Sequence, residues 1–252
     1  MIQNSFIFLE KVKRGTEEKL WNQGIYNWDS FLNTKEIKGL SKTRKTYYNK
    51  KILEARKALY NFNSSYFRNI LPSSENYRLY DFFKEDAVFL DIETTGLSPR
   101  YNNITIIGLY DGINTKMMVR GINLDMKEIK KELQKYKLIV TFNGSSFDLP
   151  FINKIYPNLL PNIPHMDLRH TAKKLGLTGG LKNIEKTIGI NRRKIIKDFH
   201  GGDAVTLWKM YKATGDDYYL NLLIEYNEED IINLKKLAEF CTSKLKNNFP
   251  GN

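Results

Sequence analysis

The chain contains 252 residues, of which 41% are hydrophobic and 27% are charged, a composition that excludes an intrinsically disordered protein. Its single cysteine, Cys241, excludes a disulfide framework and a cysteine-based zinc site. With 40 Lys and Arg against 28 Asp and Glu, the net charge of +12 favours a polyanionic partner such as nucleic acid. Because the chain shows neither a long apolar run nor a cleavable leader pattern near Met1, we expect a cytoplasmic protein without a membrane segment.

The first 80 residues carry most of the excess positive charge, and their pattern predicts a small helical region. We expect helices around 16–22, from Trp28 onward, and over the basic stretch KTRKTYYNKKILEARKALY at 42–60. In that stretch, cations that engage phosphates would alternate with tyrosines that stack on bases. An amphipathic helix with inward aromatics and solvated lysines is the other interpretation. LPSSEN, at 71–76, marks the expected boundary of this region, so residues 1–80 form one predicted unit.

Residues 84–245 form the second predicted unit, in which strands and helices alternate. The expected strands cover 87–92, 104–110, 115–120, 137–142 and 163–166, the second and third joined by the hairpin turn DGIN. The expected helices cover 124–136, 145–156 with Ser145 or Ser146 as N-cap, 167–175 with Asp167 as N-cap, and 218–240. This order predicts an α/β fold in which helices flank both faces of a mixed sheet.

Acidic residues recur at the ends of these predicted elements. Asp91 and Glu93 are two apart on a strand and therefore share one face, and Asp148 follows a second strand. Tyr226 and Asp230 are four apart on the long last helix and also share a face, so this helix can bring Asp230 over Asp91. Four clustered carboxylates repel one another, but they suit two Mg²⁺ or Mn²⁺ ions. Two such ions, about 3.5–4 Å apart, can activate a water and stabilise the leaving oxygen of a phosphodiester.

Three motifs carry a resemblance to a known family. DIETTGL, NGSSFDLP and YNEED resemble, in order and chemistry, the motifs of DEDD-type 3′–5′ exonucleases of the ribonuclease H-like superfamily. Because Tyr226 stands four residues before Asp230, the chain resembles the tyrosine subclass, and the residues of its motifs are most similar to those of the YprB-like branch. HMDL, GGLKNIE and GGDAVTLWKMYKATGD extend the resemblance over about 86–240. The chain departs from that branch at VKRG, where relatives often have a Gly-Ile-Gly hairpin, and many relatives have His in place of Tyr226.

The resemblance implies a role for each residue of the acidic motifs. Asp91 would bridge both metal ions, and Glu93 and Asp230 would complete the ligands of the first. Asp148 would hold the second ion, partly through water. Tyr226 would orient the attacking water with its hydroxyl, and a half-buried helix aromatic is the other interpretation. Its ordinary pKa of about 10 argues against a free tyrosinate as the base.

Residues around the acids offer contacts to substrate, each with a structural alternative. The backbone amides of Thr94, Thr95 and Gly96, in the turn after the strand, are placed to meet a terminal nucleotide. By resemblance, Leu97 would wedge against the terminal base, or it is an exposed turn leucine. Asn143 would bind substrate or brace its own loop. Lys182 would lie in an anion-binding nest or in a helix-initiating turn. The remaining candidates lie along the substrate path or in a solvated loop: Arg192, Arg193, Lys194 and Lys197.

The sequence therefore predicts a metal-dependent 3′–5′ exonuclease that hydrolyses single-stranded or frayed ends of nucleic acid. In this interpretation the basic helical region holds the strand by its phosphates, and the acidic cluster cleaves it. One alternative is a non-catalytic nucleic-acid-binding module on the same fold, and another is a structure-specific endonuclease. DNA and RNA are both open as substrates, because recognition of the 2′-hydroxyl has no linear signature.

Overall fold

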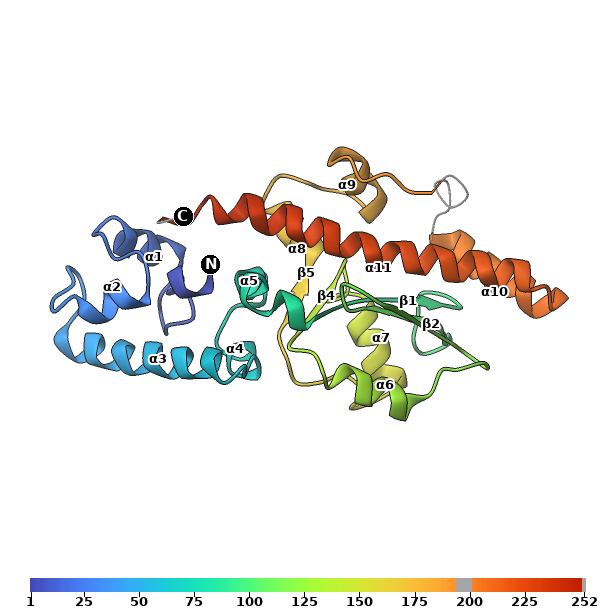
Figure 1. The fold of residues 1–252 in the computed structure, drawn as a ribbon, viewed down its shortest axis with the longest axis horizontal. Helices are drawn as coiled ribbons and strands as arrows, with labels where there is room; N and C mark the ends of the chain where they lie inside the picture. The colour runs from blue at the N-terminus through green and yellow to red at the C-terminus, as the bar shows by residue number, and fades with distance from the viewer. Residues whose placement is uncertain (194–200, 251–252) are drawn as a thin grey trace.

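The computed structural model describes residues 1–193 and 201–250, which form a mixed sheet, its flanking helices and an N-terminal helical region (Figure 1). The strands are β1 (Ala87–Thr94), β2 (Ile104–Tyr110), β3 (Thr115–Val119), β4 (Leu138–Thr141) and β5 (His165–Asp167). The α-helices are α1 (Arg14–Trp21), α2 (Trp28–Asn33), α3 (Lys42–Tyr60), α4 (Ser65–Arg68), α5 (Tyr80–Phe83), α6 (Met126–Leu133), α7 (Asp148–Ile155), α8 (Leu168–Lys173), α9 (Leu181–Thr187), α10 (Gly201–Thr214) and α11 (Asp217–Lys246). The short 3-10 helices of the described residues are η1 (Ile2–Asn4), η2 (Ser73–Leu79) and η3 (Lys84–Asp86).

The five strands form one sheet in the order β3-β2-β1-β4-β5. Strands β1, β2 and β3 pair antiparallel, whereas β4 pairs parallel with β1, and β5 pairs parallel with β4. Strand β1 is central and almost wholly buried, as its run of large apolar residues predicts. The predicted α/β fold, with a mixed sheet flanked by helices, is therefore confirmed.

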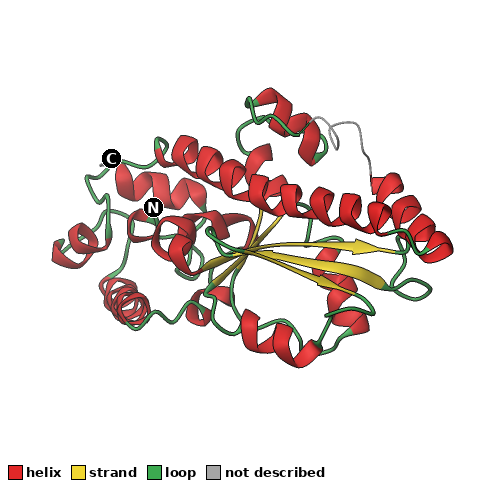
Figure 2. Ribbon diagram, turned by 45° about the vertical axis from the view of Figure 1, so that its right-hand side comes forward, coloured by secondary structure: helices red, strands yellow, loops and turns green. Residues whose placement is uncertain are grey.

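Alternation along β1 divides the core into two layers. Val88, Leu90 and Ile92 face one side and pack in a cluster with Ile129 of α6 and Phe151 of α7. The opposite face of β1 is covered by α11, the long helix that crosses the sheet in Figures 1 and 2. Each large apolar side chain fully buried in these layers contributes roughly 1.5–3 kcal/mol. The odd-numbered residues of β1, which include Asp91 and Glu93, therefore lie under α11.

The N-terminal helices share one continuous hydrophobic core with the sheet and with the C-terminal half of α11. Phe6, Trp28 and Ile52 belong to the same buried cluster as Leu138 of β4 and Leu245 of α11. In Figure 1, α1–α3 lie at the opposite end of the molecule from α10. Among the helices in the described parts of the chain, none is both long and apolar enough to cross a membrane.

A buried ion network also joins the N-terminal helices to the α/β part. The Arg78 guanidinium donates to both carboxylate oxygens of Glu17, each at 2.8 Å, and to Glu75 at 2.6 Å. Lys174, which follows α8, donates to the other oxygen of Glu75 at 2.7 Å. Arg78 is 3% exposed and Glu17 is 0% exposed, so these charges are held together without help from solvent.

One predicted helix start is wrong, and the reason bears on the site. Neither Ser145 nor Ser146 caps α7, which begins at Asp148 with Phe147 as its N-cap residue. Ser145 instead donates its hydroxyl to Asp167, which also accepts the backbone N–H of Ser145 at 3.1 Å. Asp167 caps α8 as predicted, by accepting from the Arg169 N–H. The longer loop places the Asp148 carboxylate, rather than a serine, in the first turn of α7.

Candidate metal centre

Three of the four predicted acids converge at the C-terminal half of β1. Asp91 and Glu93 come from β1, and Asp230 comes from the face of α11 that covers it. One carboxylate oxygen from each of the three residues lies within 4.8 Å of the other two. Glu93 and Asp230 are buried and Asp91 is half-buried. Two-residue spacing on the strand and the position of α11 together create this group.

Asp148 approaches the same strand from the first turn of α7. Its Oδ1 accepts the backbone N–H of Ile92, the residue between Asp91 and Glu93, at 3.2 Å. The side chain is buried, and its charge is the next cause after burial that raises the pKa of Asp91. All four predicted carboxylates therefore belong to one electrostatic unit, in which Asp148 stands beside the tight group of three.

Burial and mutual repulsion raise the pKa values of these acids. Burial is the main cause for Asp91, reinforced by Asp148 and Asp230, and its pKa lies well above the ordinary value. Burial, then Asp230, has the same effect on the pKa of Glu93. Burial raises the pKa of Asp148 to about 7, although backbone N–H donors oppose the change. It raises the pKa of Asp230 to about 6, against the opposing charge of Arg192.

Tyr226 lies one helical turn before Asp230 and is buried beside the acids. Burial, with the charges of Asp230, Glu93 and Asp91, raises the pKa of its phenol far above the ordinary value. The hydroxyl therefore keeps its proton at any physiological pH. Lys182 of α9 points at the same ring, with its Nζ 4.9 Å from the ring centroid. Among the described residues, that buried Nζ has no hydrogen-bond partner.

The motif YNEED contains a third site residue, beside Tyr226 and Asp230, that the sequence did not indicate. Asn227 donates its side-chain N–H to Asp91 at 2.7 Å and so holds one oxygen of that carboxylate. Gly108 of β2, which pairs with Asp91 across the strands, makes this contact possible. A Cβ added at Gly108 would lie 2.0 Å from the Asn227 Oδ1. A glycine inside a strand pattern was the available signal for such a close approach.

Arg192 belongs to the site more directly than the sequence indicated. Its guanidinium donates to Asp230 and, from Nε at 2.5 Å, to Glu185 of α9. The side chain is 4% exposed, so the solvated-loop interpretation is wrong for Arg192, and its place along the substrate path stays a prediction. Arg193 is half-exposed and lies 3.8 Å from Glu225, whereas Lys194 and Lys197 lie outside the described residues.

The turn after β1 is held by its own side chains. Thr94 donates its hydroxyl to the Gly96 carbonyl at 2.8 Å, and the Thr95 N–H donates to the Asn103 carbonyl at 2.9 Å. Gly96 has φ +159°, and an added Cβ there would lie 2.6 Å from the Asn102 side chain. Leu97 is 85% exposed at the tip of this ordered turn. The amide of Thr95 is thus already paired within the turn.

Asn143 braces its own loop. It adopts a left-handed backbone conformation with φ 64°, which asparagine tolerates better than most residues. Its N–H donates to Asp167 at 2.8 Å, and its side-chain oxygen accepts from Arg169 at 2.7 Å. These contacts describe the bracing alternative, and contact with a substrate stays a prediction.

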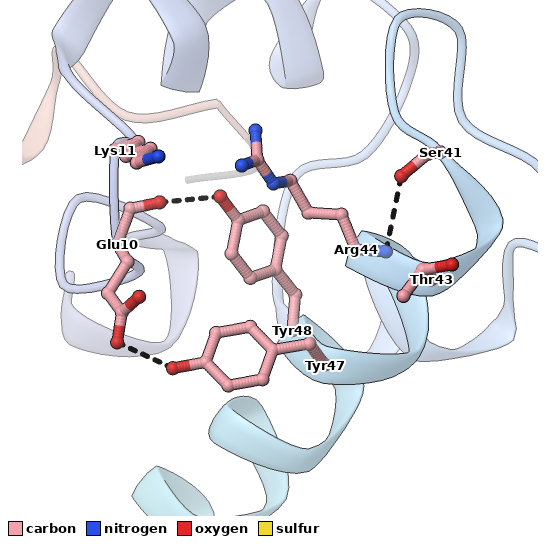
Figure 3. Close-up of a pocket in the computed structure, with 7 residues that line it drawn as sticks. All are labelled: Glu10, Lys11, Ser41, Thr43, Arg44, Tyr47 and Tyr48. Atoms are coloured by element: carbon pink, nitrogen blue, oxygen red, sulfur yellow. Dashed lines mark hydrogen bonds between the residues drawn. The ribbon is translucent and has the colours of Figure 1, made fainter.

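The basic helix α3 presents some of its predicted aromatics and buries others. Tyr48 is buried and donates to the Glu10 carbonyl at 2.5 Å, while the more exposed Tyr47 donates to the Glu10 carboxylate at 2.5 Å (Figure 3). Arg44 and Lys11 line the same pocket, whose volume is about 430 Å³. The helix therefore combines an inward aromatic face with a pocket that carries two cations, and its binding of nucleic acid stays a prediction.

Comparison with solved structures gives distant matches. A family B DNA polymerase from the hyperthermophilic archaeon Pyrobaculum calidifontis matches 61% of this chain at 14% identity with a TM-score of 0.51. The match covers only 24% of the polymerase chain. Brucella melitensis NrnC matches 67% of this chain and 78% of its own at 17% identity with a TM-score of 0.47. The polymerase match shows a shared fold and no more.

Sequence comparison identifies the family. No curated protein matches this chain. The family model of the RNase_H superfamily matches residues 88–242, which run from the first residues of β1 almost to the end of α11. That span contains all but the first residue of the sheet strands and all four acids. The chain therefore belongs to the RNase_H superfamily.

Proposed function

We propose that this chain is a divalent-metal-dependent 3′–5′ exonuclease that hydrolyses phosphodiester bonds at single-stranded or frayed nucleic-acid ends. One observation carries the proposal: oxygens of Asp91, Glu93 and Asp230 lie within 4.8 Å of one another, beside buried Asp148. Such a cluster weakens a fold, because like charges repel and lose hydration. The superfamily and the order of the three motifs support the same chemistry.

The donor set fits a hard divalent cation. The converging ligand atoms are all carboxylate oxygens, which Mg²⁺ and Mn²⁺ prefer. Asp91, Glu93 and Asp230 would hold one ion, and Asp148 would contribute to a second. Ions held there supply positive charge that acidifies an attacking water and stabilises a leaving oxygen.

The chain's own residues would position the reactants. Asn227 fixes one oxygen of Asp91, so the orientation of that carboxylate is set before substrate arrives. Tyr226 retains its proton because burial raises its pKa, and its hydroxyl would orient the attacking water as a hydrogen-bond partner. Lys182, whose buried Nζ has no hydrogen-bond partner among the described residues, would face a phosphate oxygen.

The turn after β1 and the basic helix would hold the strand. Leu97, exposed at the tip of the turn, would pack against the terminal base, and the backbone amide of Gly96 in the same turn would lie along the last nucleotide. Asn143, in the loop before α7, would line the same path. Cations of α3 would contact phosphates far from the cut, which predicts binding that weakens with salt.

Labelled single-stranded DNA and RNA, incubated with Mg²⁺, Mn²⁺ or chelator, test the proposal. We expect metal-dependent shortening from the 3′ end by the native chain, and loss of about three orders of magnitude in rate for Asp91→Ala. Glu85→Ala, which removes an exposed acid from η3, is the matched control and should retain full rate. Full activity of Asp91→Ala would overturn the catalytic assignment.

Circular single strands separate the terminal mode from the alternatives. An exonuclease leaves a circle intact while degrading the linear strand of the same sequence. Cleavage of the circle would replace the proposal with an endonuclease on the same acids. Binding of both substrates without cleavage under any metal would leave a nucleic-acid-binding module.

A further inference from the structure

A buried chain of alternating charges connects α9 to the acidic cluster. Arg192 donates to Glu185 through Nε at 2.5 Å and through Nη2 at 2.9 Å, and the same Nη2 donates to Oδ1 of Asp230. The exposed fractions of the Arg192 and Glu185 side chains are 4% and 1%. One guanidinium is therefore shared between an acid of the candidate metal centre and an acid outside it.

The two acids hold Arg192 with different geometry. Glu185 takes two donors of the guanidinium in a forked arrangement, which is the strong and directional form of this interaction. Asp230 takes only one, from a nitrogen that Glu185 also uses. Glu185 lies in the same short helix as Lys182 and shares neither β1 nor α11 with the cluster. Glu185 therefore competes with Asp230 for the donors of the guanidinium.

This arrangement sets a competition at Asp230. A divalent ion held by Asp91, Glu93 and Asp230 would either bind the same Asp230 oxygen that accepts from Arg192 or lie close to the positive charge of Arg192. A unit charge near a divalent ion changes the binding constant by roughly tenfold even under water-like screening. Asp230 is the only member of the group of three with an ion-pair partner among the described residues.

We propose that Arg192 is a resident counter-cation of Asp230 that lowers the affinity of the site for divalent ions, and that Glu185 is a positioning residue that restrains it. The inference rests on the proposed metal-dependent function. Removal of the Arg192 charge should tighten metal binding, because Asp230 loses a competing cation. Loss of the Glu185 charge should weaken metal binding, because the charge of the guanidinium would then be compensated by Asp230 alone. Opposite shifts from two partners of one ion pair are not expected from a purely structural brace.

Direct binding of Mn²⁺ to the full chain, followed by the electron paramagnetic resonance signal of free Mn²⁺, measures these shifts without any activity. We expect Arg192→Gln to bind Mn²⁺ roughly tenfold more tightly than the native chain and Glu185→Gln to bind it several-fold more weakly. Lys212→Gln on α10 and Glu128→Gln on α6 remove exposed charges of each sign and should leave the affinity unchanged. Equal or weaker binding by Arg192→Gln would overturn the inference.

Arg192→Gln leaves Glu185 buried without its partner, which can prevent folding. A second variant covers that case. The double variant Arg192→Gln/Glu185→Gln removes both charges and should bind Mn²⁺ more tightly than Glu185→Gln. Affinity equal to that of Glu185→Gln would overturn the inference. Thermal unfolding with chelator monitors the fold of each variant.

One further variant separates this inference from the proposed function. Asp91→Asn should weaken Mn²⁺ binding in the native background, because it removes a ligand. If the native chain binds no Mn²⁺, or if Asp91→Asn leaves binding intact, the metal centre and this inference both fail. If Asp91→Asn weakens binding while Arg192→Gln leaves it unchanged, the metal centre stands and only the role of Arg192 fails.

Discussion

Two buried groups of charged residues in this chain follow opposite rules. Around Arg78 the signs alternate, and each carboxylate oxygen of Glu17 and Glu75 accepts from a donor. Around Asp91 the same sign accumulates, and burial raises the pKa of every acid. The first group holds two parts of the molecule together. The second is costly until a cation neutralises it, which is the mark of a site shaped for binding and not for stability.

The largest expected effect breaks the alternating group. Arg78→Met leaves Glu17 buried without its partner, and we expect the free energy of unfolding to fall by about 3–5 kcal/mol. Arg56→Met removes an arginine whose partner, Asp29, is mostly exposed, so the loss should stay near or below about 1 kcal/mol. Denaturant unfolding of both variants makes the comparison. Equal losses would show that burial does not distinguish the two pairs.

The next effect distorts the acidic group without changing any charge. In Gly108→Ala the new methyl would collide with the Asn227 side chain and displace it from Asp91. We expect a loss of roughly 1–3 kcal/mol in stability and a lower cleavage rate under metal. Gly202→Ala, in open space on α10, is the control and should be neutral or slightly stabilising. Unaltered cleavage by Gly108→Ala would mean that Asn227 does not position Asp91.

A third change relieves the like-charge repulsion. With chelator at neutral pH, Glu93→Gln should raise the free energy of unfolding by roughly 1–2 kcal/mol, because it removes a buried charge whose pKa is raised by burial and by Asp230. Glu75→Gln should lower the free energy of unfolding, since the charge of Glu75 is compensated by Arg78 and Lys174. Added Mn²⁺ should stabilise the native chain more than Glu93→Gln. Destabilisation by Glu93→Gln in chelator would contradict the contrast between the two groups.

The smallest effect tests alternation near the surface. Burial opposes ionisation of Glu132, but donors from Lys116, Lys135 and Tyr136 outweigh it and hold its pKa at about 2. Because the folded pKa is depressed, the stabilisation is present above the unfolded pKa and is lost as pH falls through about 2. Glu132→Gln should therefore cost about 1 kcal/mol at pH 7, limited by the exposure of the two lysines. The difference in unfolding free energy between the native chain and Glu132→Gln should begin to shrink as pH falls below about 4 and should vanish only below about 2.

Local patterns predicted the elements of this molecule well. The run AVFLDI predicted β1, and the alternation of apolar and acidic residues within it predicted that Asp91 and Glu93 share one face. The predicted start of α7 is wrong, because neither Ser145 nor Ser146 is its N-cap. In the structure the Ser145 hydroxyl donates a hydrogen bond to Asp167, more than twenty residues away in sequence. Capping patterns take account only of residues close in the sequence, and Asp167, which binds the Ser145 hydroxyl, is not one of these.

In the candidate site, too, local patterns predicted some residues, whereas others depend on contacts between remote segments. Spacing and motif order predict Asp91, Glu93, Asp148 and Asp230 as one group. Asn227 lies within the motif YNEED, yet its contact with Asp91 depends on the absence of a side chain at Gly108 in another strand. Such a contact has no signature in either segment alone.

The sequence by itself determined which residues are apolar, which acids fall on one face, and where β1 and α11 form, because these follow from periodicities of two and 3.6 residues. Only the tertiary structure decided which opposite charge each acid meets: Arg78 for Glu17, Arg192 for Asp230, and no cation at hydrogen-bond distance for Glu93 among the described residues. Pairing of charges depends on distances of a few ångströms between remote segments, and packing sets those distances.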